Sequence, residues 1–274
     1  MNKASLLFVP CITMLVLSMT YFFLNVLNLS YPYLFNLFFL ISLLSFFEYV
    51  IPKFFFSHES SFILRDLFFI FLNPLLIPLV WFLVTSKMIH IPSFSFEILG
   101  QMPFSLLVVF IYIVGEFFRY WVHRLQHQVP FLWKYHAVHH CMKEIKVINS
   151  FISHPLDYFL RGILPFTPFL FFNIPIEALI YARTLSMVFS ILSHANLSID
   201  NGFWNLIFPT YQVHRWHHSF NPRLANNNYG IGTLLWDHCF NSYFFPKKDK
   251  DSKFGILDSA YNDREISSLL WIEK

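Results

Sequence analysis

Long apolar runs separated by short polar segments dominate the first half of the chain. Residues 6–27 contain no charged residue, and residues 33–51 contain one, Glu48, near their end. Two further runs follow at 62–84 and 102–122. Because about 20 apolar residues span the hydrocarbon core of a bilayer, this pattern predicts four transmembrane helices.

Prolines divide the apolar regions further. Asn73-Pro74 and Pro78 lie inside the third run, where we expect a kink or a break because proline removes a backbone donor. Residues 88–100 are mixed and predict a loop. A fifth apolar region, 159–193, predicts two shorter helices that dip into the membrane or lie on it. Three prolines interrupt that region: Pro165, Pro168 and Pro175.

Composition supports a membrane protein rather than a soluble one. The chain of 274 residues is 56% hydrophobic and 13% charged, whereas soluble domains carry about 25% charged residues. We therefore predict an all-α, multi-pass integral membrane protein. The net charge of +3 is too small to indicate a nucleic-acid partner. The three cysteines form no CxxC pair and indicate buried or partly buried thiols rather than a disulfide framework.

Charge and length also suggest how the chain sits in the membrane. Lys3 precedes the first run, as in a signal peptide, but the run is long for one and no A-x-A-like site follows it. We therefore expect an uncleaved anchor. The histidine-bearing segments and the C-terminal tail carry most of the basic residues, which predicts that they lie on the cytoplasmic side.

Histidine is concentrated in the second half of the chain. Of the 13 histidines, all but His58 and His90 lie between residues 123 and 238. Those two stand alone in polar connections and are expected to be ordinary surface residues. Eight others form one HxxxH and two HxxHH motifs: His123, His127, His136, His139, His140, His214, His217 and His218.

The spacing of these motifs indicates metal binding. Residues three and four apart lie on one side of a helix, so each motif aims its imidazoles together. Neutral imidazole is a common ligand of zinc, copper, iron and nickel, and buried histidines without partners are costly. Eight nitrogen donors exceed the four of one tetrahedral site. The motifs therefore predict two metal ions.

The motifs together resemble those of the fatty acid hydroxylase / sterol desaturase superfamily. They are, in order, "HRLQH", "HAVHH", "NSFISHP", "LSHANL", "HRWHHS" and "NNNYGIGTLLWDHCFNSYF". The likeness covers roughly residues 105–245. Only residues 128–135 separate the first two motifs, which favours this branch over membrane acyl desaturases. The resemblance implies a membrane enzyme with two iron ions and a cytosolic, histidine-rich helical cap, using molecular oxygen to hydroxylate or desaturate a lipid.

The resemblance also implies roles for individual residues. His194 is expected to join the eight motif histidines as a metal ligand. His154 is either a further ligand or a histidine that starts a helix beside Pro155, and His238 is expected to be no ligand. Three residues could orient ligand imidazoles through hydrogen bonds or could simply cap local turns: Asn149, Asn196 and Asp237.

One motif departs from the family pattern. The family's final motif usually reads WDxxFGT, whereas this chain has "WDHCFNS", with Asn241 and Ser242 in place of glycine and threonine. The change leaves the metal prediction intact but weakens any inference about how the cap closes over substrate. We expect one integrated domain with three regions: a transmembrane region 1–100, a catalytic region 101–245 and a polar tail 246–274.

The predicted chemistry requires an electron source. One-electron oxygen chemistry on an unactivated C–H bond belongs to a metal cofactor. The chain has neither a GxGxxG fingerprint nor a CxxC redox pair, so a separate donor protein of cytochrome or ferredoxin type is implied. Sterol, fatty acyl, sphingoid and carotenoid-like substrates all remain open, as do the choice between hydroxylation and desaturation and the oligomeric state.

Two other functions compete with a lipid oxidase. Intramembrane histidines could carry metal ions along a transport path, or the protein could be a metal-binding scaffold without activity. The motifs lie after the ends of the apolar runs, whereas a transporter would spread polar groups through several spans. Oxygen consumption coupled to lipid turnover would separate the first function from the other two.

Overall fold

A computed structural model describes most of the chain, and its regular elements are helices. The described residues are 3–27, 32–55, 61–88, 97–172, 174–246, 253–256, 261 and 266–270. Within them the extended contacts are two isolated bridges, Pro52 with Leu197 and Ser219 with Phe254. The predicted all-α class is therefore confirmed as a predominantly helical fold. His58 and His90 lie outside the described residues.

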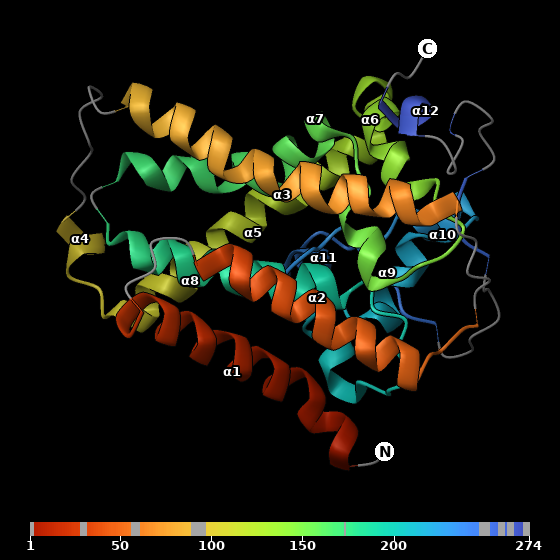
Figure 1. The fold of residues 1–274 in the computed structure, drawn as a ribbon, viewed down its shortest axis with the longest axis horizontal. Helices are drawn as coiled ribbons and strands as arrows, with labels where there is room; N and C mark the ends of the chain where they lie inside the picture. The colour runs from red at the N-terminus through yellow and green to blue at the C-terminus, as the bar shows by residue number, and fades with distance from the viewer. Residues whose placement is uncertain are drawn as a thin grey trace.

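Four long helices run back and forth between the two ends of the molecule (Figure 1). They are α1 (Lys3–Asn25), α2 (Pro32–Val50), α3 (Ser61–Met88) and α5 (Phe104–Gln128). Within the described residues, α1, α2 and α5 are long and apolar enough to cross a membrane. The histidine-bearing elements gather at the end of the molecule where α1 begins, opposite α4 (Figure 1).

The third apolar run forms one helix, so of the kink or break expected at Asn73-Pro74 the break does not occur. Proline is tolerated inside such helices when neighbouring elements satisfy the freed backbone groups. Here the buried Asn73 amide also fastens α3 to a neighbouring segment, because its Nδ2 donates to the carbonyls of Phe151 at 2.7 Å and Ser153 at 2.9 Å. The predicted loop at 88–100 contains the short helix α4 (Glu97–Gly100), and residues 89–96 lie outside the described residues.

α5 leads almost directly into the next histidine-bearing helix, α6 (Pro130–His140). Val129 ends α5 and caps α6, with an extended backbone. Pro130 occupies the first position of α6, where its missing N–H costs no hydrogen bond and its fixed φ favours a helix start. The one-residue junction holds the "HRLQH" and "HAVHH" motifs close together.

The fifth apolar region forms two helical segments, as predicted. The first runs through α7 (Pro155–Tyr158), a π-helical turn η2 (Phe159–Ile163) and a 3₁₀ segment η3 (Leu164–Phe171). The second, α8 (Ile176–Leu192), begins directly after Pro175. α8 packs along α5 and also contacts α1 and α2. Gly115 of α5 permits close approach to η3, since a Cβ there would overlap the Phe166 ring.

The remaining elements are short and surround the histidines. They are η1 (Val147–Phe151), η4 (Gly202–Leu206), α9 (Tyr211–His217), α10 (Pro222–Ala225), α11 (Leu235–Cys239) and α12 (Ile266–Leu270). The described parts of the C-terminal tail pack on this half of the molecule. Phe254 and Leu269 are buried, and the Tyr261 hydroxyl donates to the Lys134 carbonyl at 2.9 Å. Cys141 is a buried free thiol as predicted, whereas Cys11 and Cys239 are exposed.

Candidate metal centre

Nine histidines meet in two adjacent groups. The first group is His123, His127, His136, His140 and His217, and the second group is His139, His194, His214 and His218. Within each group, one ring nitrogen from every member lies within 4.8 Å of those of the others. These are the nine histidines that the sequence singled out. His194, directly beyond the C-cap of α8, completes the second group.

The two HxxHH motifs exchange their rings between the groups. In α6, His136 and His140 join the first group while His139 turns to the second. In α9, His214 and the C-cap residue His218 join the second group while His217 turns to the first. The geometry of a helix explains the division, because residues four apart nearly eclipse whereas the residue three along points well to one side.

The inner nitrogens of the rings almost touch. The recorded Nε2–Nε2 distances are 3.1 Å for His123–His136, 3.2 Å for His136–His127, 3.1 Å for His140–His136, 3.0 Å for His217–His123, 3.1 Å for His194–His139 and 3.1 Å for His218–His214. Across the boundary between the groups, the rings of His140 and His218 stack with centroids 4.4 Å apart. The nine rings therefore form one continuous cluster.

The outer nitrogens face hydrogen-bond acceptors. In the first group, Nδ1 of His123 donates to the Tyr229 carbonyl at 2.6 Å and Nδ1 of His217 to the Asn227 carbonyl at 2.8 Å. In the second group, Nδ1 of His139 donates to the Ile152 carbonyl at 3.0 Å and Nδ1 of His194 to the Ser190 carbonyl at 3.0 Å. A carbonyl oxygen can only accept, so each of these imidazoles carries its proton on Nδ1. The Nε2 atom is then left with a lone pair.

Facing lone pairs make the cluster suited to cations. Two unprotonated nitrogens about 3 Å apart repel each other unless a positive ion or a proton lies between them. Burial lowers the pKa of His194 and of His217 to about 3, so a proton is not available near neutral pH. Burial and the neighbouring rings also hold the pKa of His140, His214 and His218 well below the ordinary value. The residues present thus fit two nitrogen-ligated metal ions.

A buried carboxylate supports the first group, and the sequence interpretation missed it. Asp157 of α7 accepts from His136 Nδ1 at 2.8 Å and from Gln126 Nε2 at 2.7 Å. It also pairs with Arg161 at 3.1 Å and accepts from the Ser153 hydroxyl. Burial alone would raise the pKa of Asp157, but Arg161, His136 and Ser153 outweigh it and hold that pKa well below its usual range. The signal in the sequence was an aspartate four residues before an arginine in an apolar stretch.

Asp237 acts on the first group through the backbone rather than on an imidazole. Its carboxylate accepts from the backbone N–H groups of Tyr229 at 2.8 Å and Gly230 at 2.7 Å. This fixes the turn whose Tyr229 carbonyl receives the proton of His123. Gly230 is required there, because a Cβ would overlap the backbone of Thr233.

The departure from the family's final motif preserves this turn. Asn241 adopts a φ of 54°, a left-handed conformation that glycine and asparagine accept most readily. Ser242 retains a hydroxyl, which donates to Asp237 Oδ1 at 2.7 Å. The pair of substitutions therefore keeps both the backbone geometry and the hydrogen bond to the aspartate.

The other predicted residues play local structural parts. Asn149 Oδ1 accepts from the Lys146 backbone N–H at 2.7 Å and caps η1. His154 caps α7, accepting from Leu156 N at 3.1 Å, and belongs to neither histidine group. His238 also belongs to neither group, and its Nε2 donates to the Leu206 carbonyl at 2.8 Å.

Asn196 helps to join the loop after His194 to the segment that follows α2. We call these contacts, together with those of Glu48 described below, the Glu48 clamp. The Asn196 side chain pairs with the backbone of Phe54, through Oδ1 at 2.9 Å and Nδ2 at 2.8 Å. Glu48, at the end of α2, accepts from the backbone N–H groups of Asn196 at 2.6 Å and Val147 at 2.8 Å. α2 thereby holds both the loop after His194 and the start of η1. In the sequence, Glu48 was noted only as an isolated charge.

Comparison with known proteins agrees with the motifs. The profile of the family described as fatty acid hydroxylase matches residues 108–242. The ornithine lipid hydroxylase OlsE of Rhizobium tropici is 31% identical over 156 residues, which cover 57% of this chain and 47% of that protein. The alkylglycerol monooxygenase of Caenorhabditis elegans is 26% identical over 158 residues, which cover 58% of this chain and 31% of that protein. A Delta(7)-sterol 5(6)-desaturase of Aspergillus fumigatus is 28% identical over 183 residues, which cover 63% of this chain and 46% of that protein.

These matches confirm the resemblance drawn from the motifs. The profile match includes every histidine of both groups, because all nine lie between residues 108 and 242. The chain spans less than half the length of each of these three relatives. No solved structure matches the chain.

Proposed function

We propose that the protein, whose residues 108–242 match the profile of the fatty acid hydroxylase family, is an oxygen-dependent membrane oxidoreductase. It would hydroxylate or desaturate a C–H bond of a lipid. The relatives are named for hydroxylation, monooxygenation and desaturation of different lipids. Both outcomes begin with removal of a hydrogen atom from carbon, so the same site serves either reaction.

One observation carries this proposal: nine histidine rings bring one nitrogen each into two compact groups, within 4.8 Å of the others in each group. In the proposal each group holds one metal ion, and the ions are iron in the active protein. Bound iron would supply the one-electron chemistry that activates molecular oxygen, the co-substrate, toward an alkyl C–H bond. Zinc lies above ferrous iron in intrinsic affinity for nitrogen ligands, so protein purified from ordinary medium is expected to carry some zinc.

The surrounding residues have separate duties in this proposal. The acceptors on Nδ1 fix the tautomer and direct each Nε2 lone pair inward. Asp157 makes His136 a stronger donor, because a carboxylate on Nδ1 raises the basicity of the ring. Most of the cluster is shielded from water, with His123, His136 and His217 at 0% exposure and His127 partly exposed. Exclusion of water protects a reactive centre from side reactions.

We also propose four membrane crossings, by α1, α2, α3 and α5, with the histidine cap on the cytoplasmic side. The alternating run of these helices supports an even number of crossings. The native cysteines can serve as labelling probes for the orientation. Cys239 is exposed and lies in α11 among the histidine-bearing elements, whereas Cys11 lies within α1. An impermeant thiol reagent should label Cys239 only after permeabilisation, with Cys239→Ser as the control. Labelling of Cys239 in intact cells would reverse the orientation.

Two further parts of the proposal concern partners and organisation. A separate cytochrome- or ferredoxin-type protein would deliver the electrons, as the lack of a nucleotide or CxxC motif implies. Regions 1–100, 101–245 and 246–274 would act as one integrated domain. Contacts of α8 with α1 and α2, and the Glu48 clamp, support joint folding of the first two regions.

The decisive experiment combines metal content, oxygen and lipid analysis. Protein made in iron-rich medium should contain two iron ions per chain. Cells that express it should gain an oxidised or unsaturated lipid only under oxygen, with the metal-depleted protein inactive. Wild-type turnover with zinc alone or without metal would overturn the proposal. Bound metal with no oxygen-dependent product would instead favour a metal-binding or transport protein.

A further inference from the structure

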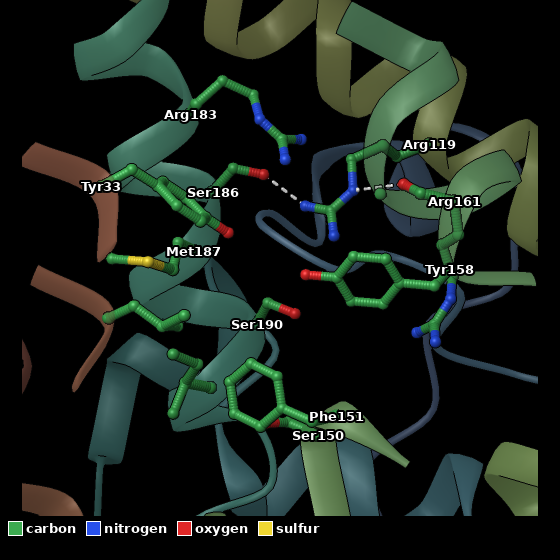
Figure 2. Close-up of a pocket in the computed structure, with 13 residues that line it drawn as sticks. Tyr33, Arg119, Ser150, Phe151, Tyr158, Arg161, Arg183, Ser186, Met187 and Ser190 are labelled. Carbon is green, nitrogen blue, oxygen red and sulfur yellow. Dashed lines mark hydrogen bonds between the residues drawn. The ribbon is translucent and has the colours of Figure 1, made fainter. Parts of the chain in front are cut away.

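A polar cavity lies beside the second histidine group. It encloses about 50 Å³ and is lined by Tyr33 of α2, Tyr158 and Arg161 from the α7–η2 segment, Arg119 of α5, and Arg183 and Ser190 of α8. Figure 2 shows the hydroxyls of Tyr158 and Ser190 directed into the same open space, below the guanidinium groups of Arg119 and Arg183. A space of this size holds a small polar group, but not an alkyl chain.

The backbone links the cavity wall to the second group. The carbonyl of Ser190, a lining residue, accepts the His194 Nδ1 proton at 3.0 Å. Phe151, another lining residue, directly precedes Ile152, whose carbonyl accepts the His139 Nδ1 proton at 3.0 Å. The wall of the cavity is therefore joined to His139 and His194 through the backbone, although no histidine lines the cavity itself.

Two of the three arginines in the cavity already have carboxylate partners. Arg119 Nη1 pairs with Glu116 Oε1 at 2.8 Å, and Arg161 Nη2 pairs with Asp157 Oδ2 at 3.1 Å. Arg119 also donates to the Arg161 carbonyl at 3.1 Å and to the Ser186 hydroxyl (Figure 2). These two cations are balanced and held in place.

Arg183 has no such partner among the described residues. Its Cζ lies 4.7 Å from the centroid of the Phe166 ring, and the carboxylate that acts on it electrostatically is Glu116, which is already paired with Arg119. Arg161 adds a buried Nε donor that has no hydrogen-bond partner within the described part of the chain. Because arginine keeps its charge inside proteins, the cavity retains one uncompensated positive charge and several unused donors.

We propose that this cavity binds an anionic group of the lipid substrate, a carboxylate or a phosphate, and that Arg183 determines the specificity for it. A guanidinium matches these anions through paired hydrogen bonds, and a neutral headgroup would leave the Arg183 charge unbalanced in a partly buried site. The inference rests on the proposed function, since it names the class of lipid that the same site would oxidise. The alkyl chain would lie outside this cavity.

The test uses the full-length, metal-loaded protein in detergent and lipid pairs that differ only in charge. Palmitate is compared with hexadecanol, lysophosphatidate with monoacylglycerol, and inorganic phosphate is measured alone. Wild-type protein should bind at least one anionic lipid about tenfold or more tightly than its neutral partner, as expected for hydrogen bonds to a charged group. Arg183→Gln should reduce that preference to about twofold or less, and Arg183→Lys should retain part of it.

Arg223→Gln provides the matched control, because it removes the same charge from an exposed site on α10. It should leave the preference unchanged. Equal binding of charged and neutral lipids by the wild type overturns the inference, even if Arg183→Gln does not fold, and so does an unchanged preference in a folded Arg183→Gln. Binding of inorganic phosphate as tight as that of the lipids would make this a free-anion site and overturn the lipid assignment.

The same samples separate this inference from the proposed function. Metal content and oxygen-dependent product are measured beside binding. Product formation without an anion preference defeats the cavity inference alone. Anion binding without metals or product defeats the proposed function and leaves the cavity as a lipid-binding site of another kind.

Discussion

Both histidine groups orient imidazoles through backbone carbonyls, but only the first group adds a carboxylate among the described residues. In the first group His136 is fixed by the Asp157 carboxylate, and that carboxylate is itself held by Gln126 and Arg161. In the second group the recorded acceptors are backbone carbonyls, those of Ile152 and Ser190 for His139 and His194. His214 Nδ1 has no partner within the described residues.

This difference predicts that the two groups bind metal with unequal affinity. A carboxylate raises the basicity of the imidazole it contacts more than a neutral carbonyl does, and outer contacts of this kind are worth roughly 10–100-fold in affinity. The first group should therefore hold its ion more tightly than the second. The second group lies beside the polar cavity, where an exchangeable position for substrate or oxygen would be useful.

Removal of a ring from either group should have the largest effect and should separate the two sites. His140→Ala is expected to empty the first group and His214→Ala the second, each leaving one metal per chain instead of two. Turnover should fall by about a hundredfold or more, since even loss of an outer contact costs 10–100-fold. Elemental analysis and product formation, measured together, check this, with the exposed His238→Ala as control. Two metals and wild-type turnover in both variants would contradict the metal assignment.

Replacement of the carboxylate should erase the difference between the groups. Asp157→Asn keeps the shape of the side chain but removes the charge that faces His136 Nδ1. The affinity of the first group for metal should fall about 10–100-fold, so that a chelator titration that removes two ions in separate steps becomes a single step. If two well-separated steps persist in the variant, the carboxylate does not set the order of metal loss.

Acid should weaken both groups alike in the metal-free protein. Burial lowers the pKa of His194 and His217 from 6.5 to about 3, so both stay neutral in the fold while the unfolded chain takes up protons below about pH 6.5. Each therefore stabilises the fold less as pH falls from 6.5 toward 3, by about tenfold in the unfolding equilibrium per pH unit. Thermal unfolding against pH tests this. His194→Gln and His217→Gln should each reduce the slope equally, and an unchanged slope in both would contradict the shared burial effect.

The smallest effect should come from Asn73, which binds the segment that carries the Ile152 carbonyl and Ser153. Asn73→Ala removes two buried hydrogen bonds to the segment that carries the Ile152 carbonyl, at a cost in unfolding free energy of about 1–3 kcal/mol. Metal affinity should fall a few-fold, more in the second group, because the Ile152 carbonyl contacts His139 directly whereas Ser153 reaches His136 only through Asp157. Asn36→Ala is the matched control, because it breaks a buried bond to Thr20 between α1 and α2, away from the histidines. Equal loss of metal in the two variants would show a general stability effect.

The histidines could be predicted from the sequence because ligand spacing follows helix geometry. Helical offsets placed three motifs on three helices, and the family motifs added His194. The exchange of rings between groups could not be predicted, because it depends on how α6 and α9 face each other. Asp157 was missed for a similar reason: 21 positions separate it from His136 in the chain, and only tertiary packing brings them together.

Proline and asparagine show a second limit of sequence patterns. Asn73-Pro74 predicted a break in the third apolar run, yet α3 continues through it. The local penalty of proline is intrinsic to the chain, whereas the tertiary contacts beside it, such as the bonds of the Asn73 amide to residues 151–153, depend on how distant segments pack. Local patterns identify where the backbone is weak but not which tertiary partner stabilises it.

The exchange of rings between α6 and α9 makes the two metal sites cooperative. Neither helix can present its histidines to one ion without also aligning the remaining ones for the other, since each helix serves both groups. The first ion to bind must order both helices, and the second enters a frame whose conformational entropy is already lost. An ion in the first group should therefore raise the affinity of the second group, although the first group still binds its own ion more tightly. Assembly of the pair would then follow an order, in which the first ion prepares the site of the second.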